Sequence, residues 1–247
     1  MFRLVLWGAL FGLALNVQAA SVSVAVASNF IAPMRKIAEA FAQETGHQAV
    51  LASGSTGGFH VQIKNGAPFE VLLAADDETP LRIEREGLGV EGSRFTYAIG
   101  QLVLWSEQPG YVDAGGNILR SSKFDRIAIA NPRLAPYGSA AVETLTRLGV
   151  LKDVQSRLVQ GENIAQTYQF VATGNVQLGF VALSQVISDG KISRGSGWIV
   201  PPDFHTPIRQ DAILLVNGKD HPAAIALMKF LRGEKARAVI RSFGYDI

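Results

Sequence analysis

The sequence lacks cysteine altogether and contains few histidines. None of its 247 residues is cysteine, which excludes disulfide bonds, thiol catalysis and thiolate metal sites. The four histidines, His47, His60, His205 and His221, lack the spacing of a metal site and are expected at the surface. A chain of this length buries enough apolar surface to fold without disulfides.

An excess of charge of one sign is also absent. The formal net charge is +2 at pH 7, and no basic stripe is visible along the chain. Proteins that bind nucleic acid carry clustered Lys and Arg side chains, so nucleic acid is not expected as a partner. Hydrophobic residues make up 48% of the chain and charged residues 18%, which indicates a folded chain with a proper core.

Long apolar runs are absent after the first twenty residues. The chain starts with the charged segment 1–3, continues with an apolar run over 4–15, and reaches two small residues at 19–20. This pattern is typical of a cleaved secretory signal peptide over residues 1–20, and it predicts export to the periplasm. The alternative, an uncleaved anchor, is disfavoured because the run is shorter than the roughly 18 residues that span a bilayer.

The rest of the chain alternates strand and helix patterns. The first set predicts strands at 21–27, 48–52 and 71–75 and helices at 32–45, 59–65 and 80–86. The second set predicts strands at 101–105, 127–130, 178–182 and 213–216 and helices at 139–148, 165–172 and 223–231. This order predicts an α/β fold with two lobes, each a mostly parallel sheet flanked by helices, and a ligand in the cleft between them.

The two sets of elements give the domain boundaries. Residues 1–20 are the signal peptide, residues 21–99 together with 211–247 form the first lobe, and residues 100–210 form the second. The chain is expected to cross between the lobes near residues 98–100 and 205–211.

Four turns contain the candidate ligand-binding groups. Residues 27–30 and 54–58 each follow a strand, precede a helix and contain no charged side chain. Residues 131–139 and 161–164 take the same position in the second set of elements. Such turns present backbone N–H groups, hydroxyls and the positive end of a helix dipole, which together suit a small anion. Each turn also has a simpler explanation. Ser28, Asn29, Ser55, Thr56 and Asn163 are ordinary helix caps, and residues 136–138 are a turn with a packed ring.

The same turns carry a resemblance to a known family. Residues 26–30 with 32–34 resemble the first motif of periplasmic molybdate-binding proteins, and residues 54–57 with 62–63 and 66–68 resemble the second. Residues 71–76, 130–132, 136–138 and 179–182 continue the match. The resemblance covers nearly the whole chain after the signal peptide, and its motifs are specific through their order and spacing.

The resemblance implies a fold, a function and a set of ligand residues. The fold is the two-lobed type II periplasmic binding fold. The function is delivery of molybdate, and also tungstate, to the permease of an ABC importer, with no catalysis, no cofactor and a monomeric chain. The residues implied as ligands of molybdate are Ser28, Asn29, Thr56, Tyr137 and the backbone of Ile164. Molybdenum is bound as the oxyanion, so no side chain coordinates the metal directly.

The match has two departures. Thr56 stands where many members of the family have serine, so the hydroxyl is kept and a methyl group is added, and the register leaves Ser55 as the alternative donor. Some members have a tyrosine ligand where this chain has Ala182, and Tyr137 is expected to take over that role.

The chemistry of the turns agrees with a dianion and leaves alternatives open. Molybdate carries no proton at neutral pH and needs only donors, whereas phosphate keeps a proton and favours an acceptor. Sulfate is also a proton-free dianion, so charge does not exclude it. Two further alternatives are an exported hydrolase, with Ser28 or Ser55 as nucleophile and His47 or His60 as base, and a sensor domain.

Overall fold

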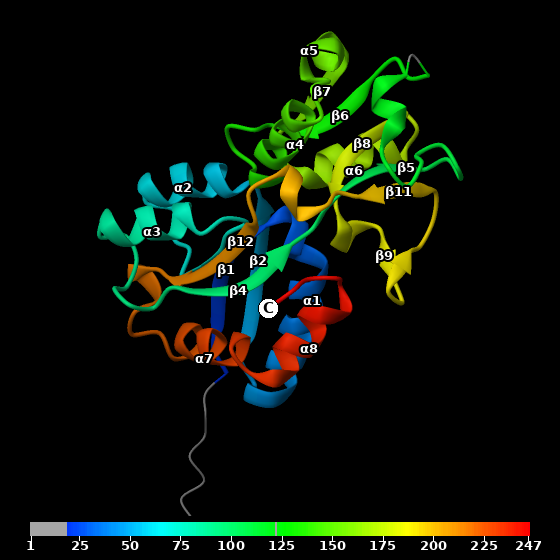
Figure 1. Ribbon diagram of the computed structural model, residues 1–247. Coiled ribbons are helices and arrows are strands. Elements are labelled where there is room, and N and C mark those ends of the chain that lie inside the picture. Colours follow the sequence, from blue (N-terminus) through cyan, green and yellow to red (C-terminus); the bar gives the residue numbers. More distant parts are fainter. Residues whose placement is uncertain (1–18, 122) are drawn as a thin grey trace, which may run out of the picture.

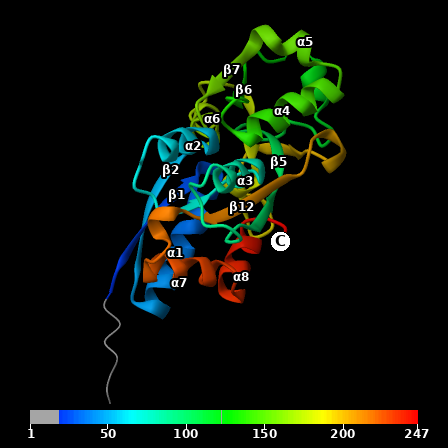
Figure 2. The same ribbon diagram turned by 90° about the vertical axis from the view of Figure 1, so that its left-hand side faces the viewer.

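Two lobes, each built on a five-stranded sheet, make up the molecule. The structure is a computed structural model and describes residues 19–121 and 123–247. Figures 1 and 2 show the second lobe, in green and yellow, stacked on the first lobe, which contains both ends of the described chain. The predicted signal peptide lies almost wholly outside the described residues. Within the described ranges, no helix has both the length and the apolar character needed to cross a membrane.

The first lobe contains a mixed sheet with the strand order β2-β1-β3-β12-β4. Its strands are β1 (Ser21–Ala27), β2 (Gln48–Gly54), β3 (Val71–Leu73), β4 (Phe95–Gly100) and β12 (Ile208–Leu214). β1 pairs in parallel with β2 and β3, whereas β12 pairs antiparallel with β3 and β4. β4 and β12 are the strands at which the chain leaves this lobe and returns to it (Figure 1).

Alternating side chains of these strands bury both faces of the sheet. Val24 and Val26 pack on one face against α1 (Ile31–Thr45), α7 (Pro222–Leu231) and α8 (Glu234–Ser242). Ala25 and Leu72 pack on the other face against α2 (Thr56–Lys64) and α3 (Glu78–Arg85). A strand that is apolar at every position is what a sheet covered by helices on both sides requires.

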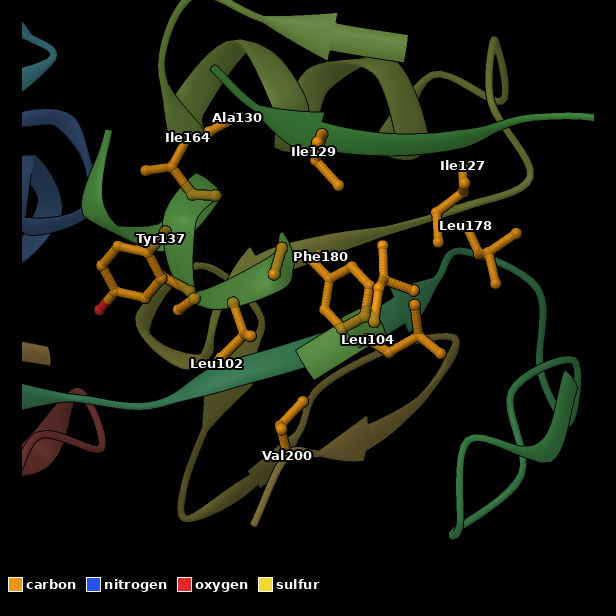
Figure 3. Packing of buried hydrophobic residues seen from close by; sticks show 14 of the residues in the cluster. Leu102, Leu104, Ile127, Ile129, Ala130, Tyr137, Ile164, Leu178, Phe180 and Val200 are labelled. Carbon is orange, nitrogen blue, oxygen red and sulfur yellow. The ribbon is translucent and has the colours of Figure 1, made fainter. Parts of the chain in front are cut away.

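The second lobe repeats the arrangement with the order β11-β5-β8-β6-β7. Its strands are β5 (Leu102–Ser106), β6 (Ile127–Ala130), β7 (Leu158–Gly161), β8 (Leu178–Ala182) and β11 (Ser196–Ile199). Its α-helices are α4 (Pro136–Arg147), α5 (Leu151–Val154) and α6 (Ile164–Ala172), and β9 (Ile187–Ser188) with β10 (Lys191–Ile192) forms a small hairpin. Figure 3 shows its larger core, where Leu104, Ile127 and Phe180 meet.

Short 3-10 helices complete the described chain. They are η1 (Ser28–Phe30), η2 (Asn117–Arg120), η3 (Gln155–Arg157), η4 (Leu183–Gln185), η5 (Pro202–Phe204) and η6 (Val216–Gly218). η1 leads directly into α1, so the first predicted turn is a tight helical turn and not an open loop.

The predicted two-lobed α/β fold is confirmed, and three details of the prediction are wrong. Each sheet is mixed, with two parallel and two antiparallel pairings, because one strand, β12 in the first sheet and β5 in the second, runs against the other four. The strands β4, β7 and β11, the helix α8 and the short elements α5, β9 and β10 were not predicted. β12 begins at Ile208, five residues before the predicted strand, and its first five residues pair with β4 in the first sheet.

Candidate functional site

Residues from all four predicted turns line one small cavity. It lies between the lobes at the carboxyl ends of β1, β2, β6 and β7, where α/β proteins bind their ligands. The residues that line it are Ala27, Ser28, Asn29, Gly54, Ser55, Thr56 and Ala75 of the first lobe and Ala135, Pro136, Tyr137 and Ile164 of the second. All five residues implied by the family resemblance are among them. No charged side chain belongs to this lining.

The N-termini of four helices lie at this cavity. η1 begins at Ser28, α2 at Thr56, α4 at Pro136 and α6 at Ile164. The first N–H groups of a helix have no partner within the helix, and the helix dipole adds partial positive charge at that end. The cavity therefore offers hydrogen-bond donors from both lobes without a formal positive charge.

Thr56 and Ser55 differ in how their hydroxyls are held. The buried Thr56 Oγ1 accepts a hydrogen bond of 2.9 Å from the N–H of Ala75. Because that N–H can only donate, the Thr56 hydroxyl keeps its own proton for a ligand. Ser55 caps α2 by position, yet its side chain makes no capping bond and has no protein partner within the described ranges. Both side chains line the cavity, and Thr56 is the one held in a fixed orientation.

Ser28 and Asn29 present different groups. The buried Ser28 hydroxyl has no protein partner among the described residues, so it is available to a ligand. The side-chain amide of Asn29 donates to Gln210 Oε1 at 2.8 Å and to Tyr245 Oη at 3.0 Å. These two bonds use both amide hydrogens. Asn29 therefore has only its backbone N–H left to donate into the cavity, a distinction that the sequence does not reveal.

Tyr137 reaches the cavity from the first turn of α4. Figure 3 shows its ring at the edge of the apolar core with the hydroxyl oxygen directed away from that core. That oxygen accepts a hydrogen bond of 3.3 Å from Gln210 Nε2. Burial raises the pKa of Tyr137 well above 10, with a smaller contribution from Tyr245, so the phenol stays neutral and keeps its proton. The next residue is Gly138, where a Cβ would lie 2.2 Å from the carbonyl oxygen of Ala130, so glycine allows α4 to start this close to β6.

Ile164 contributes a backbone N–H at the start of α6. Asn163 caps this helix, and its Oδ1 accepts from the N–H groups of Ala165 and Gln166, both at 3.0 Å. The cap leaves the N–H of Ile164 without a protein partner in the described part of the chain. Asn163 is thus a cap, as its simpler explanation predicted. Glu162 is exposed and outside the cavity lining, as expected for a site that binds an anion.

A larger cavity of about 390 Å³ lies beside the first and shares Ala75, Ala135 and Pro136 with it. It contains Asp76, which the sequence did not bring into consideration as a neighbour of the site. Burial raises the pKa of Asp76 to about 6, against a lowering effect of the hydrogen bonds from the Thr79 N–H and hydroxyl. A carboxyl group with this pKa is mostly ionised at pH 7 and becomes neutral in mild acid.

Comparison with known proteins assigns the family. The family model of bacterial extracellular solute-binding proteins matches residues 22–246. The chain belongs to this family. It is 58% identical to the molybdate-binding protein ModA of Azotobacter vinelandii over 95% of this chain and 93% of that protein. It is 48% identical to the molybdate-binding protein ModA of Rhodobacter capsulatus over 95% of this chain and 91% of that protein.

Solved structures agree with this assignment. The periplasmic molybdate-binding protein of Azotobacter vinelandii superposes with a TM-score of 0.89 at 41% identity, covering 92% of this chain and 99% of that one. The sulfate-binding protein SubI of Mycobacterium tuberculosis superposes with a TM-score of 0.73 at 12% identity, covering 92% of this chain and 86% of that one, which shows the shared fold alone.

The structure gives no support to the hydrolase alternative, and the family is one of binding proteins. His47 Nδ1 accepts from the N–H of Ala20, and His60 Nε2 lies 3.0 Å from Glu86. Neither histidine contacts Ser28 or Ser55, so the nucleophile and base required for such a reaction are not paired. His47 and His205 are buried, which corrects the prediction of a surface position for both. Among the described residues, no cluster of His, Asp and Glu side chains is arranged to hold a metal ion.

Proposed function

We propose that this chain is the periplasmic solute-binding protein of an ABC importer and that its ligand is molybdate. The family supplies the role of a binding protein. The ligand is inferred from the relatives that share 58% and 48% of their aligned residues with it, both of which are molybdate-binding proteins. The permease of the importer is then the partner that receives the ligand, and a cleaved signal peptide over residues 1–20 places the chain in the periplasm.

The observation that carries the proposal is the chemistry of the cavity lining. Ser28, Thr56 and Tyr137 offer hydroxyls, and Asn29 and Ile164 offer backbone N–H groups, while no carboxylate lines the cavity. A dianion without a proton accepts hydrogen bonds from all of these groups and needs no acceptor in return. Each charge-assisted bond contributes about 1.5–3 kcal/mol, so five of them support tight binding after the ordering costs.

Other oxyanions are separated by proton content and size. Phosphate keeps a proton near neutral pH, and this cavity has no carboxylate to accept it. Tungstate has the same charge and shape as molybdate and is expected to bind as well. Sulfate remains the second candidate because it carries no proton and a sulfate-binding protein has the same fold.

A calorimetric titration of residues 21–247 with molybdate, tungstate, sulfate and phosphate tests the proposal. We expect tight binding of molybdate and tungstate, much weaker binding of sulfate and no measurable binding of phosphate. Preferential binding of sulfate would replace the proposed ligand by the second candidate. The absence of heat with all four anions would reject oxyanion binding altogether.

A further inference from the structure

Six buried polar side chains connect the two lobes behind the cavity. Their hydrogen bonds measure 2.8–3.3 Å and join residues up to 216 positions apart in the sequence. They are Asn29, Tyr97, Gln210 and Tyr245 of the first lobe and Tyr137 and Ser184 of the second. We call this set the hinge network, because Tyr97 and Gln210 lie on the crossing strands β4 and β12.

Gln210 occupies the centre of the hinge network. Its side chain is fully buried as the third residue of β12, between Arg209 and the equally buried Asp211. Its Oε1 lies 2.8 Å from the amide nitrogen of Asn29, which donates to it, and 3.1 Å from the hydroxyl of Tyr97. Its Nε2 donates to the hydroxyl oxygen of Tyr137 at 3.3 Å. A buried amide at such a position is destabilising unless these bonds are made.

The bond to Tyr137 determines what that hydroxyl can do. An amide N–H donates and never accepts, so the Tyr137 oxygen is the acceptor in this bond. The single phenolic proton is then left for another partner. Tyr137 lines the cavity, whereas Gln210 does not, so a ligand in the cavity competes with the neighbouring Tyr245 hydroxyl for this proton.

The backbone of β4 keeps this contact close. At Gly100, a Cβ would lie 2.1 Å from the hydroxyl oxygen of Tyr137 and 2.6 Å from Gln210 Nε2. Only glycine leaves space for both groups at this point of the crossing strand. The approach of the two side chains is therefore built into the hinge itself.

We propose that Gln210 is a positioning residue for oxyanion capture, which acts through Tyr137 without touching the ligand. Its amide holds the Tyr137 oxygen as an acceptor and so directs the phenolic proton to the anion. Through Asn29 it also fixes the first-lobe turn whose backbone N–H groups face the same anion. The inference rests on the proposed function, since it assumes that an oxyanion occupies the cavity.

The test is a double-mutant cycle with Tyr137→Phe, read by calorimetric titration with molybdate. Gln210→Met keeps the length of the side chain and removes the donor. In the parent background we expect it to raise the Kd for molybdate about five- to twentyfold. In the Tyr137→Phe background we expect a change of less than about twofold, because the hydroxyl that Gln210 directs is already gone.

An equal loss of affinity in both backgrounds would overturn the proposal, because a structural role of Gln210 does not depend on the Tyr137 hydroxyl. Gln210→Glu gives a second test that preserves shape. Its carboxylate accepts a hydrogen bond from the Tyr137 hydroxyl and repels the dianion, so its Kd should exceed that of Gln210→Met, and an equal or smaller Kd counts against the proposal.

The controls separate this inference from the proposed function. Ser106→Ala removes a fully buried hydroxyl of β5 that donates to the carbonyl of Gln177, far from the cavity lining, and should leave the Kd unchanged. If the parent protein itself fails to bind molybdate, the proposed function is wrong. If the parent binds and the cycle is additive, only the role of Gln210 is wrong.

Discussion

Two hydroxyls of the cavity are held by the same device. Thr56 Oγ1 accepts from the N–H of Ala75, and the Tyr137 oxygen accepts from the amide of Gln210. Both partners are obligate donors, so each hydroxyl keeps its proton for the ligand space. A site made this way favours a fully deprotonated anion, because it offers donors in fixed directions before the ligand arrives.

Removing a hydroxyl should therefore lower affinity in a predictable order. We expect Ser28→Ala and Thr56→Ala each to weaken molybdate binding about ten- to a hundredfold, since each deletes a charge-assisted bond worth roughly 1.5–3 kcal/mol. Thr56→Ser keeps both the hydroxyl and its bond to Ala75 and should change the affinity far less. Calorimetric titration measures all three variants.

Thr144→Val is the matched control for these variants. Thr144 is fully buried in α4, and its hydroxyl donates to the carbonyl of Ala140 and lies outside the cavity lining. The Thr144→Val variant should have a lower free energy of unfolding than the parent and an unchanged Kd for molybdate. If Ser28→Ala and Thr56→Ala behave like this control, the site lies elsewhere.

Asp76 should make stability depend on pH. Burial raises its pKa from 3.8 to about 6, so the folded state binds the proton more tightly than the unfolded state. Its contribution to stability is fully present below about pH 4 and is lost as pH rises through 6. Asp76→Asn removes this dependence, so its free energy of unfolding should exceed that of the parent at pH 8, with the advantage disappearing near pH 4.

Urea unfolding of the ligand-free protein across this range measures the effect of Asp76. Asp77→Asn is the control, because Asp77 lies next in the chain and its side chain makes no capping bond to α3. A parent and an Asp76→Asn variant that differ by a constant amount from pH 4 to pH 8 would contradict the raised pKa.

At the scale of elements, the sequence predicted which turns meet at one cavity better than it predicted the sheets. The four turns were found because the ligand site of such a fold lies at strand ends, where caps and small residues stand out. β1, β6 and β8 were predicted with their observed bounds. All residues of β6 and β8 are buried, and all residues of β1 except Ser21 and Ser23 are buried. The remaining elements depend on contacts between distant segments, which one sequence does not display.

The missed elements have physical reasons. β7 is a half-exposed edge strand that pairs only with β6, so it lacks an apolar pattern. α8 carries four charged residues in nine and buries only Ala236 and Ile240. β12 carries Gln210 and Asp211, both fully buried and polar, and Asp211 is satisfied by Arg94 and Thr96, more than a hundred positions away. Such buried polar positions look like a loop until their partners are known.

The start of α2 also forms the contact that brings the lobes together. The N–H of Gly57 donates to the carbonyl of Leu134 in the other lobe at 2.9 Å. A Cβ at Gly57 would lie 3.1 Å from Leu134 Cα, which forces the lobes apart by a few tenths of an ångström. Gly57→Ala should therefore weaken molybdate binding about three- to tenfold, while the better helix propensity of alanine keeps the ligand-free stability at or above that of the parent.

Titration and thermal unfolding of the same Gly57→Ala preparation check that affinity falls while stability does not. Val61→Ala, at an exposed position of the same helix, is the control and should change neither quantity by much. A variant that loses stability and keeps its affinity would show that Gly57 serves the fold of α2 and not the contact between the lobes.

At the scale of the whole molecule, the ligand is expected to complete the contact between the two lobes. The lobes meet through Gly57 and Leu134 on one side of the cavity and through the Ser184 hydroxyl and the Asn29 carbonyl, 2.9 Å apart, on the other. Between these contacts, donors from both lobes converge on one space. An anion bound there stabilises both lobes at once, because neither lobe alone satisfies it.

Molybdate should therefore raise the melting temperature of the whole protein in one cooperative transition. Ligand at 100 times its Kd adds about 2.7 kcal/mol. For a chain of this size that is a rise of roughly 5–10 °C. The rise should be the same from pH 7 to pH 9, because burial keeps the pKa of Tyr137 well above 10 and the other donors do not titrate. Differential scanning calorimetry measures it, with sodium chloride of equal ionic strength as the control. A rise that fades between pH 7 and pH 9 would mean that a titrating group, and not the neutral hydroxyls and N–H groups, holds the anion.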